Sequence, residues 1–447
     1  MCYGATAPPS PHLTGNRPVA LTQQVVGSRT PARVALLLSI LLIGSATLFP
    51  TPGVDSESGL CLLCGSFGLT DFVLNAILFV PLGATLAAVG VPFRRCVLLA
   101  FAFTFTIELL QLSVIEGRDA SLGDIAANTL GGAIGATLVA RWERFVRPSP
   151  REARRLTIAA ALAWLAVLAL TAWAFQPDFP DGRYWVQMGN GLRDHSSFRG
   201  TVHSAQVNGR VMSVGRVRSP EFLHEELRRD GLRIELALTP DRLDPWVAPL
   251  FVLATGRREE IAIVSQHRNA LVFNGQTQAA IVGLRGPHVM LPDAFSPDSA
   301  RGPLRVTVAH HPAAISLAVS GEGHVWSATI RYGPELGWIL LFPGEVWLGE
   351  RDPLIGILSA MWIAALALPI TFWSVRTDDR CRVARGIAIG LPIVVAGLLL
   401  IPFASGLRIA SPAAWTGATA AIVAGALLAR RITRTVHREP IATPIAD

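Results

Sequence analysis

The sequence has no lysine, and all 39 of its basic residues are arginine. Charged residues make up only 16% of the chain, against 51% hydrophobic residues and a mean hydropathy of +0.43. Soluble domains carry about 25% charged residues, so this composition excludes an ordinary soluble protein. The 447 residues are instead expected to cross a membrane several times.

Cysteine is also scarce. Five cysteines are too few for a disulfide framework. The one suggestive pair is Cys61 and Cys64, in a loop expected outside the cell, where it forms either a structural bridge or two free thiols. A redox role would need a thioredoxin-like context, which the sequence lacks.

Apolar runs long enough to span a bilayer occupy much of the chain. We predict eight spans, at 34–50, 72–90, 94–115, 122–140, 155–175, 353–373, 384–403 and 410–429. The first is interpreted as an anchor rather than a signal peptide, because the polar segment before it is too long for a signal peptide.

The formal charge of +7 comes largely from arginines in short loops beside these runs. Six arginines lie in RWERFVRPSPREARR, between the fourth and fifth spans, whereas residues 51–71 contain none. Cytoplasmic loops carry the excess of positive charge, so we expect both termini in the cytoplasm of a bacterial cell and residues 176–350 outside the plasma membrane. Orientation explains this charge without a nucleic-acid partner.

Between the fifth and sixth spans the pattern changes to short alternating segments such as LRIELAL, EEIAIVSQ and LRVTVAHH, separated by Gly, Pro, Asn and Asp. This pattern predicts an all-β jelly-roll sandwich. The expected domains are a disordered N-terminus (1–32), a four-helix membrane domain (33–146), a basic linker with the fifth span (147–175), the sandwich (176–350), three C-terminal spans (351–430) and a cytoplasmic tail (431–447).

A set of polar residues interrupts the outer ends of the second, third and fourth spans and the loop between the last two. The set is Asp71, Asn75, Glu108, Gln111, Arg118, Asp119, Asp124 and Asn128. Glu108 lies inside a span, where a charge costs about 2.5–3.5 kcal/mol at the bilayer centre and less near the interface. We therefore expect it to face the bundle interior, with Arg118 as the nearest cation. The set is interpreted as a ligand-binding site, with Glu108, Arg118, Asp119 and Asp124 as candidate catalytic groups.

A purely structural interpretation of these residues stays open. Ser121 and Asp124 have the spacing of a capping box, which alone would explain Asp124, and Asp71 can likewise cap a helix start. Asn75 and Asn128 can join neighbouring helices by hydrogen bonds. Close packing of the fourth span is expected through Gly131 and Gly135.

The segments DFVLNAILFVPLGATL and TIELLQLSVIEGRDASLGDIAANTLGGAIG resemble the VanZ-like membrane family over about residues 34–146. The resemblance implies a role in the bacterial cell envelope, where the named member is linked to resistance to the glycopeptide teicoplanin. It implies no established reaction.

The inserted segment, about 178–348, resembles a concanavalin A-like or laminin G-like sandwich, which implies carbohydrate binding. The paired carboxylates that hydrolytic relatives carry on one strand are absent. Two roles stay open for the tryptophans of this segment, which are to stack on sugar rings or to fill the core of the sandwich. These tryptophans are Trp185, Trp246, Trp326, Trp338 and Trp347. Trp338 and Trp347 are expected at the membrane interface, because they lie close to the sixth span. The histidines lack metal-ligand spacing, so we expect neither metal nor cofactor.

Three functions are compatible with these features. The first is a non-enzymatic envelope protein that binds a cell-wall glycan or a lipid-linked precursor on its outer face. The second is an envelope enzyme that uses Glu108, Asp119 or Asp124 as acid or base. The third is a lipid or solute transporter, ranked last because the inner halves of the spans are apolar. Oligomeric state is left open.

Overall fold

The computed structural model describes residues 29–50, 66–115, 120–189, 196–241, 243, 246–256, 259–295, 302–312, 314–321, 323–349, 352–377 and 383–436. Residues 1–28 of the N-terminal segment expected to be disordered lie outside these residues, as do the Cys61–Cys64 pair and most of the expected tail, whereas residues 29–32 begin α1.

Eight helices in the described chain are long and apolar enough to cross a membrane. They are α1 (Arg29–Thr47), α2 (Gly68–Ala88), α3 (Phe93–Ser113), α4 (Leu122–Ala140), α6 (Pro150–Ala174), α9 (Pro353–Val375), α10 (Val383–Ser405) and α11 (Pro412–Val436). The predicted number of spans is confirmed, and with it a multi-pass membrane protein.

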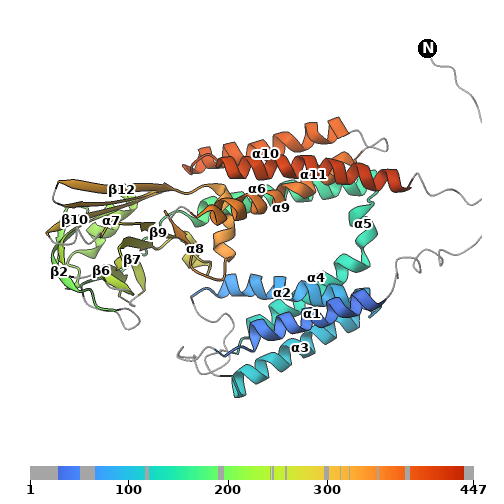
Figure 1. Cartoon of the computed structure of the whole chain (residues 1–447), viewed down its shortest axis with the longest axis horizontal. Coiled ribbons are helices and arrows are strands. Elements are labelled where there is room, and N and C mark those ends of the chain that lie inside the picture. Colours follow the sequence, from blue (N-terminus) through green and yellow to red (C-terminus); the bar gives the residue numbers. More distant parts are fainter. Residues whose placement is uncertain are drawn as a thin grey trace, which may run out of the picture.

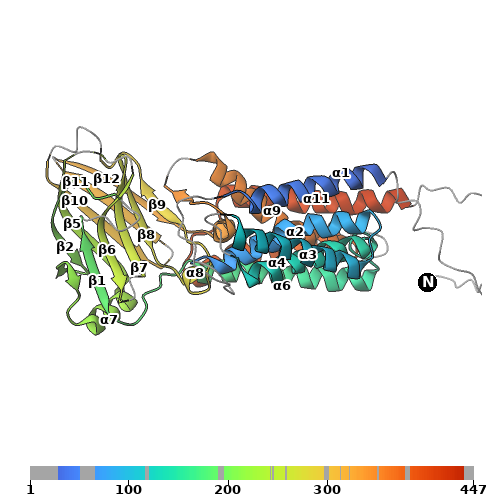
Figure 2. The same ribbon diagram turned by 90° about the horizontal axis from the view of Figure 1, so that it is seen from below.

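These helices form two groups, α1–α4 and α6 with α9–α11, which Figure 1 shows one above the other to the right of the sheets. The short helix α5 (Trp142–Val146) joins the groups at the end remote from the sheets. In the second view the helices run roughly parallel, with the sheets beyond one end (Figure 2). A capping box between Ser149 and Glu152 begins α6, with Pro150 in the first turn.

Helices α2 and α4 touch backbone to backbone because three glycines leave no side chain between them. A Cβ added at Gly131 would overlap the carbonyl group of Ala76, and one added at Gly135 would overlap that of Val80. The third glycine, Gly83 of α2, lies against the backbone of Gly132 in α4. The expected close packing through Gly131 and Gly135 is therefore present.

Between α6 and α9 the chain folds into two sheets. Their strands are β1 (Tyr184–Met188), β2 (Gly200–Val207), β3 (Arg210–Met212), β4 (Gly215–Arg216), β5 (Leu232–Pro240), β6 (Val247–Thr255), β7 (Glu260–His267), β8 (Ala270–Gly275), β9 (His288–Leu291), β10 (Leu304–His311), β11 (Ala314–Gly321), β12 (His324–Arg331) and β13 (Trp347–Leu348). One sheet has the order β13-β9-β8-β7-β6-β1-β4 and the other β12-β11-β10-β5-β2-β3.

The two sheets enclose one apolar core. Leu236 on β5 and Val306 on β10 share it with Phe251 on β6 and Val264 on β7. Strand β5 alternates buried and more exposed positions, as a sheet with one wet face requires. The segments predicted as strands become β5–β8 and β10–β12, whereas the helices α7 (Pro220–Asp230) and α8 (Gln278–Ile281) were not predicted.

The sheets rest on the ends of both helix groups opposite α5 (Figure 1), through the buried 3-10 helix η1 (Pro334–Leu341). At the start of α2, the Thr70 hydroxyl donates to the Leu340 carbonyl at 2.7 Å. On the other side, Glu335 accepts a hydrogen bond from Arg408, which follows α10, at 2.5 Å. Trp338 is buried here and donates to Ser359 of α9 at 3.1 Å, so its expected place at a lipid interface is wrong.

Candidate functional site

Three of the predicted polar residues are buried between membrane helices. Glu108 is 4% exposed, Gln111 8% and Asn128 2%. By contrast, Asn75 and Asp124 are half-buried and Asp71 is exposed. Arg118 and Asp119 lie outside the described residues. The described members therefore divide into a buried group on α3 and α4 and a more exposed group at the helix starts.

Each buried residue ties two segments together. Glu108 Oε2 accepts a hydrogen bond from the Ser121 backbone N–H at 2.7 Å, which holds the start of α4 against α3. Gln111 Nε2 donates to the carbonyl of Thr47, the last residue of α1, at 2.9 Å. These contacts meet the need of buried polar groups for partners.

Helix capping and hydrogen bonds between helices give a structural role to further residues of the polar set. Asn128 Nδ2 donates to the Thr104 hydroxyl at 2.8 Å, joining α4 to α3. Ser121 caps α4 by accepting from the Asp124 N–H at 3.2 Å, which is one half of the expected capping box. The Ser121 N–H, which the other half would use, donates to Glu108. Asp71 lies in the first turn of α2, while Phe67 takes the N-cap position, so Asp71 is not the N-cap residue.

The buried group still has free acceptor capacity. Gln111 Oε1 and Asn128 Oδ1 are buried and make no hydrogen bond with the described residues. The Asp124 carboxylate lies near enough to Glu108 to interact with it electrostatically. Carboxylate and amide oxygens accept hydrogen bonds, so this centre suits a ligand that brings hydroxyl or ammonium donors.

A second candidate site, a groove on the seven-stranded sheet, was not predicted. Its part next to the membrane is a cavity of about 790 Å³ between Phe67, just before α2, and strands β7–β9. A further cavity of about 610 Å³ forms the outer part of the groove, which Trp246 and Trp347 line. Five residues line both parts and make them one groove: Glu260, Ile263, Asn274, His288 and Glu345. Each volume is in the range of about 300–1,000 Å³ typical of small-molecule sites.

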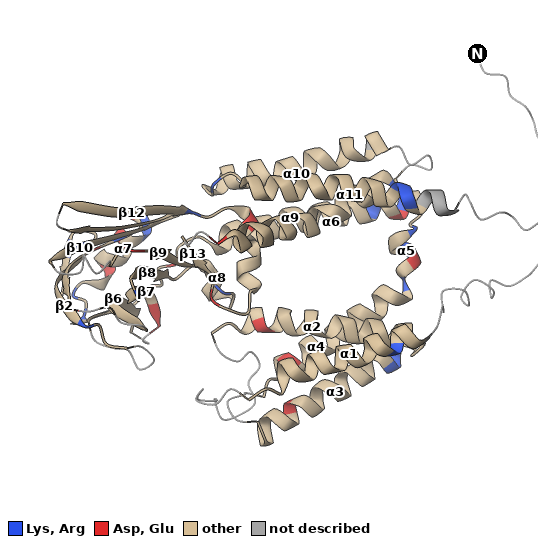
Figure 3. Ribbon diagram, viewed as in Figure 1, with Lys and Arg blue, Asp and Glu red and all other residues tan. Residues whose placement is uncertain are grey.

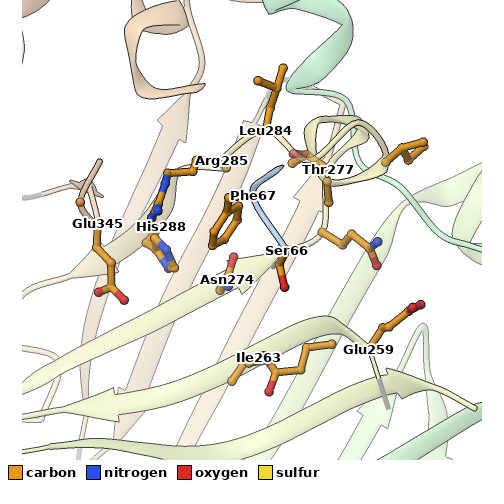
Figure 4. A pocket seen from close by; sticks show the side chains of 17 residues that line it. Ser66, Phe67, Glu259, Ile263, Asn274, Thr277, Leu284, Arg285, His288 and Glu345 are labelled. Atoms are coloured by element: carbon orange, nitrogen blue, oxygen red, sulfur yellow. The ribbon is translucent and has the colours of Figure 1, made fainter. Parts of the chain in front are cut away.

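Figure 4 shows Phe67 above the sheet, with Arg285, His288 and Glu345 on one side of it and Glu259 on the other. These residues come from the start of α2, the β8–β9 connection, β9, the segment before β13 and the turn before β7. The groove therefore depends on the membrane domain and the sheets being joined.

Aromatic rings line the outer part of the groove. Trp347 pairs in parallel register with His288, and their ring centres are 5.0 Å apart. Trp347 also stacks with His267, with ring centres 6.0 Å apart. Trp246, which is 73% exposed, lies at the outer end. An exposed indole ring beside polar groups is a surface on which a flat apolar face can stack.

The polar lining is rich in carboxylates: Glu259, Glu260 and Glu345 are all exposed. Burial lowers the pKa of His288 below its ordinary value, while the neighbouring Glu345 opposes this shift. The imidazole is consequently neutral at pH 7 and can both donate and accept. Together with the half-buried Asn274, these groups form a hydrogen-bonding wall suited to hydroxyl groups.

Residues 24–143 match the model of the family described as VanZ/LLP1. The match covers α1–α4 and supports the VanZ-like resemblance of this membrane domain, including all residues of the polar set. The sheets, η1 and α9–α11 lie outside it. No curated protein and no solved structure matches the chain.

Proposed function

We propose that this VanZ-like envelope membrane protein binds a glycan in the groove on the outer face of its seven-stranded sheet. The observation that carries the proposal is the combination of Trp246 and Trp347 with Glu260, Asn274 and Glu345 along one continuous groove.

Sugar rings have apolar faces of C–H groups and rims of hydroxyl groups. Indole rings such as Trp246 and Trp347 stack on the faces, and burying this apolar surface stabilises the complex. Carboxylates and amides such as Glu345 and Asn274 bind the rims in pairs of hydrogen bonds. Because the groove extends through both cavities, it suits a chain of several sugars better than one small compact ligand.

The proposal places the sheets outside the cell, as a concanavalin A-like jelly roll on the outer ends of the spans. Figure 3 supports this orientation, because the basic residues of the helices gather at the ends remote from the sheets. Arg94 and Arg95 at the start of α3 and Arg430 and Arg431 near the end of α11 are examples. Positive charge at those ends is typical of the cytoplasmic side.

Glycan binding is tested with the full-length protein in phosphatidylcholine nanodiscs and a panel of neutral cell-wall oligosaccharides. Trp347→Ala and Trp246→Ala are expected to weaken binding about 3- to 10-fold each, because each removes one stacking surface. The matched control is Trp185→Ala, since Trp185 is a 44% exposed tryptophan of the same sheet on β1. Failure of every glycan to bind, or equal loss in the control, contradicts the proposal.

A second proposal concerns the polar set of the membrane domain. The unpartnered oxygens of Gln111 and Asn128 favour a ligand there, with Asp71, Asn75, Glu108, Arg118, Asp119 and Asp124 as the other contributors. In the enzymatic alternative Glu108, Asp119 or Asp124 serves as acid or base on a lipid or glycan.

Glu108→Gln separates the two alternatives. Glutamine keeps an oxygen that can accept the Ser121 N–H but cannot transfer a proton. An envelope phenotype, such as glycopeptide susceptibility of a deletion strain, should not be complemented by this variant if Glu108 is an acid or base. Full complementation at normal expression removes Glu108 from any proton transfer.

A further inference from the structure

The two ends of the groove differ in chemistry. The outer end has Trp246, Trp347 and carboxylates. The end next to the membrane is lined by Phe67, Ile281 and Leu284, of which Phe67 is 38% and Ile281 59% exposed. Exposed apolar side chains at the mouth of a cavity mark a surface that contacts apolar matter.

This apolar mouth lies at the membrane surface. Phe67 is followed directly by the membrane-spanning helix α2, Gly68–Ala88. The backbone N–H groups of Leu69 and Thr70 both donate to the Gly283 carbonyl at 3.1 Å, which fixes the loop beside Ile281 to the outer end of the span. A lipid chain leaving the bilayer at this helix would therefore meet the mouth first.

One cation separates the apolar mouth from the polar part. The guanidinium carbon of Arg285 lies 4.4 Å from the centre of the Phe67 ring. Its backbone N–H donates to the Thr70 hydroxyl at 3.2 Å, which anchors the residue to α2. Its Nε is buried and has no hydrogen-bond partner within the described chain. Stacking on Phe67 leaves the edge of the guanidinium available for an anion.

The charge balance limits what that anion can be. Besides Arg285, the described lining of the groove carries Glu259, Glu260 and Glu345, and no second arginine. A free polyanion would be repelled by these carboxylates. A single phosphodiester joined to an uncharged saccharide fits, because the phosphate meets Arg285 while the sugars meet the acids as hydrogen-bond donors.

We infer that the groove binds a saccharide joined through a phosphodiester to a membrane lipid. The lipid chain lies at Phe67 and Ile281, the phosphate at Arg285, and the sugars along Asn274 and Trp347. The inference rests on the proposed glycan-binding function and narrows its ligand to glycans still attached to the bilayer.

The test uses the full chain in phosphatidylcholine nanodiscs and three probes: chitotetraose, chitotetraose joined to a C15 prenyl chain by a phosphodiester, and the same conjugate with an uncharged ether link. We expect the phosphodiester probe to bind on the order of 10- to 100-fold more tightly than the ether probe, because it gains a charged hydrogen bond. Arg285→Gln should remove that gain, so that the phosphodiester and ether probes bind equally, and Arg285→Lys should retain part of it.

The control is Arg331→Gln, an exposed arginine on β12 of the other sheet, which should leave all three affinities unchanged. Equal binding of the two conjugates, or equal loss of all probes in Arg285→Gln at unchanged thermal stability, overturns the inference while glycan binding stands. Absence of binding by all three probes overturns the proposed function together with it.

Discussion

Replacing Gly131 with alanine tests the contact that holds α2 against α4. The added methyl group would overlap the carbonyl oxygen of Ala76, which belongs to a helical backbone and cannot turn away. The helices must separate, and overpacking of this kind costs about 1–3 kcal/mol. Alanine recovers about 1 kcal/mol of helix propensity over glycine. Because the overlap is with backbone, we take the upper end of the range and expect a net loss of about 2 kcal/mol.

The measurement is the free energy of unfolding of the full-length protein in detergent micelles or nanodiscs. Gly44→Ala in α1 is the matched control, since a Cβ at Gly44 meets nothing within 4 Å. That variant should gain up to about 1 kcal/mol from helix propensity alone. If Gly131→Ala is as stable as Gly44→Ala, the close contact between α2 and α4 does not exist as described.

Three further predictions concern buried polar groups. Glu108→Ala strands the Ser121 N–H and should cost about 1–3 kcal/mol in unfolding free energy, while Glu108→Gln should cost much less; equal losses would contradict the hydrogen bond. Arg408→Gln leaves the 1% exposed Glu335 carboxylate without its cation and should lower stability by about 1.5–3 kcal/mol, seen as a lower unfolding temperature. Burial lowers the pKa of His310 to about 4, so the unfolded chain binds the proton more tightly. Stability should then fall by up to about 3 kcal/mol as the pH drops from about 6.5 to 4. His310→Leu should flatten this part of a pH titration of the unfolding free energy, and an unaltered pH profile would contradict it.

The membrane helices were predictable because their signal is local. An apolar run long enough to span the bilayer must be a helix that satisfies its own backbone, whatever it packs against. The strands β5 and β10–β12 were predictable for a similar reason, since alternation along one strand reports which face is wet. Strands β6–β8 are buried at almost every position, and short apolar runs between turn residues marked them instead. Short strands such as β13, with only Trp347 and Leu348, carry no such signal.

The groove was not predictable because its residues meet only through pairing across long separations. Trp347 lies beside His288 since β13 joins the edge of the sheet in parallel. Phe67 reaches the same groove because α2 docks on the loop at Gly283. Neither contact follows from spacing, and single tryptophans in a sandwich equally suit the core.

Within the polar set, the sequence indicated which residues share a helix face but not their partners. A charge inside a span suggested an ion pair for Glu108, whereas the described contact is with the Ser121 backbone N–H. Backbone donors at a helix start are available in every sequence, so no residue type reveals them. Arg118, the cation expected beside Glu108, lies outside the described residues.

The position of η1 has a consequence for genetics. Its residues lie between α2 and the α10–α11 turn, with Leu340 bound by Thr70 and Glu335 bound by Arg408. Excising residues 176–350 would remove η1, and with it the hydrogen bonds that link the two helix groups at the end opposite α5. A strain carrying that truncation would lose the architecture of the whole protein, so single substitutions at the groove are the informative alleles.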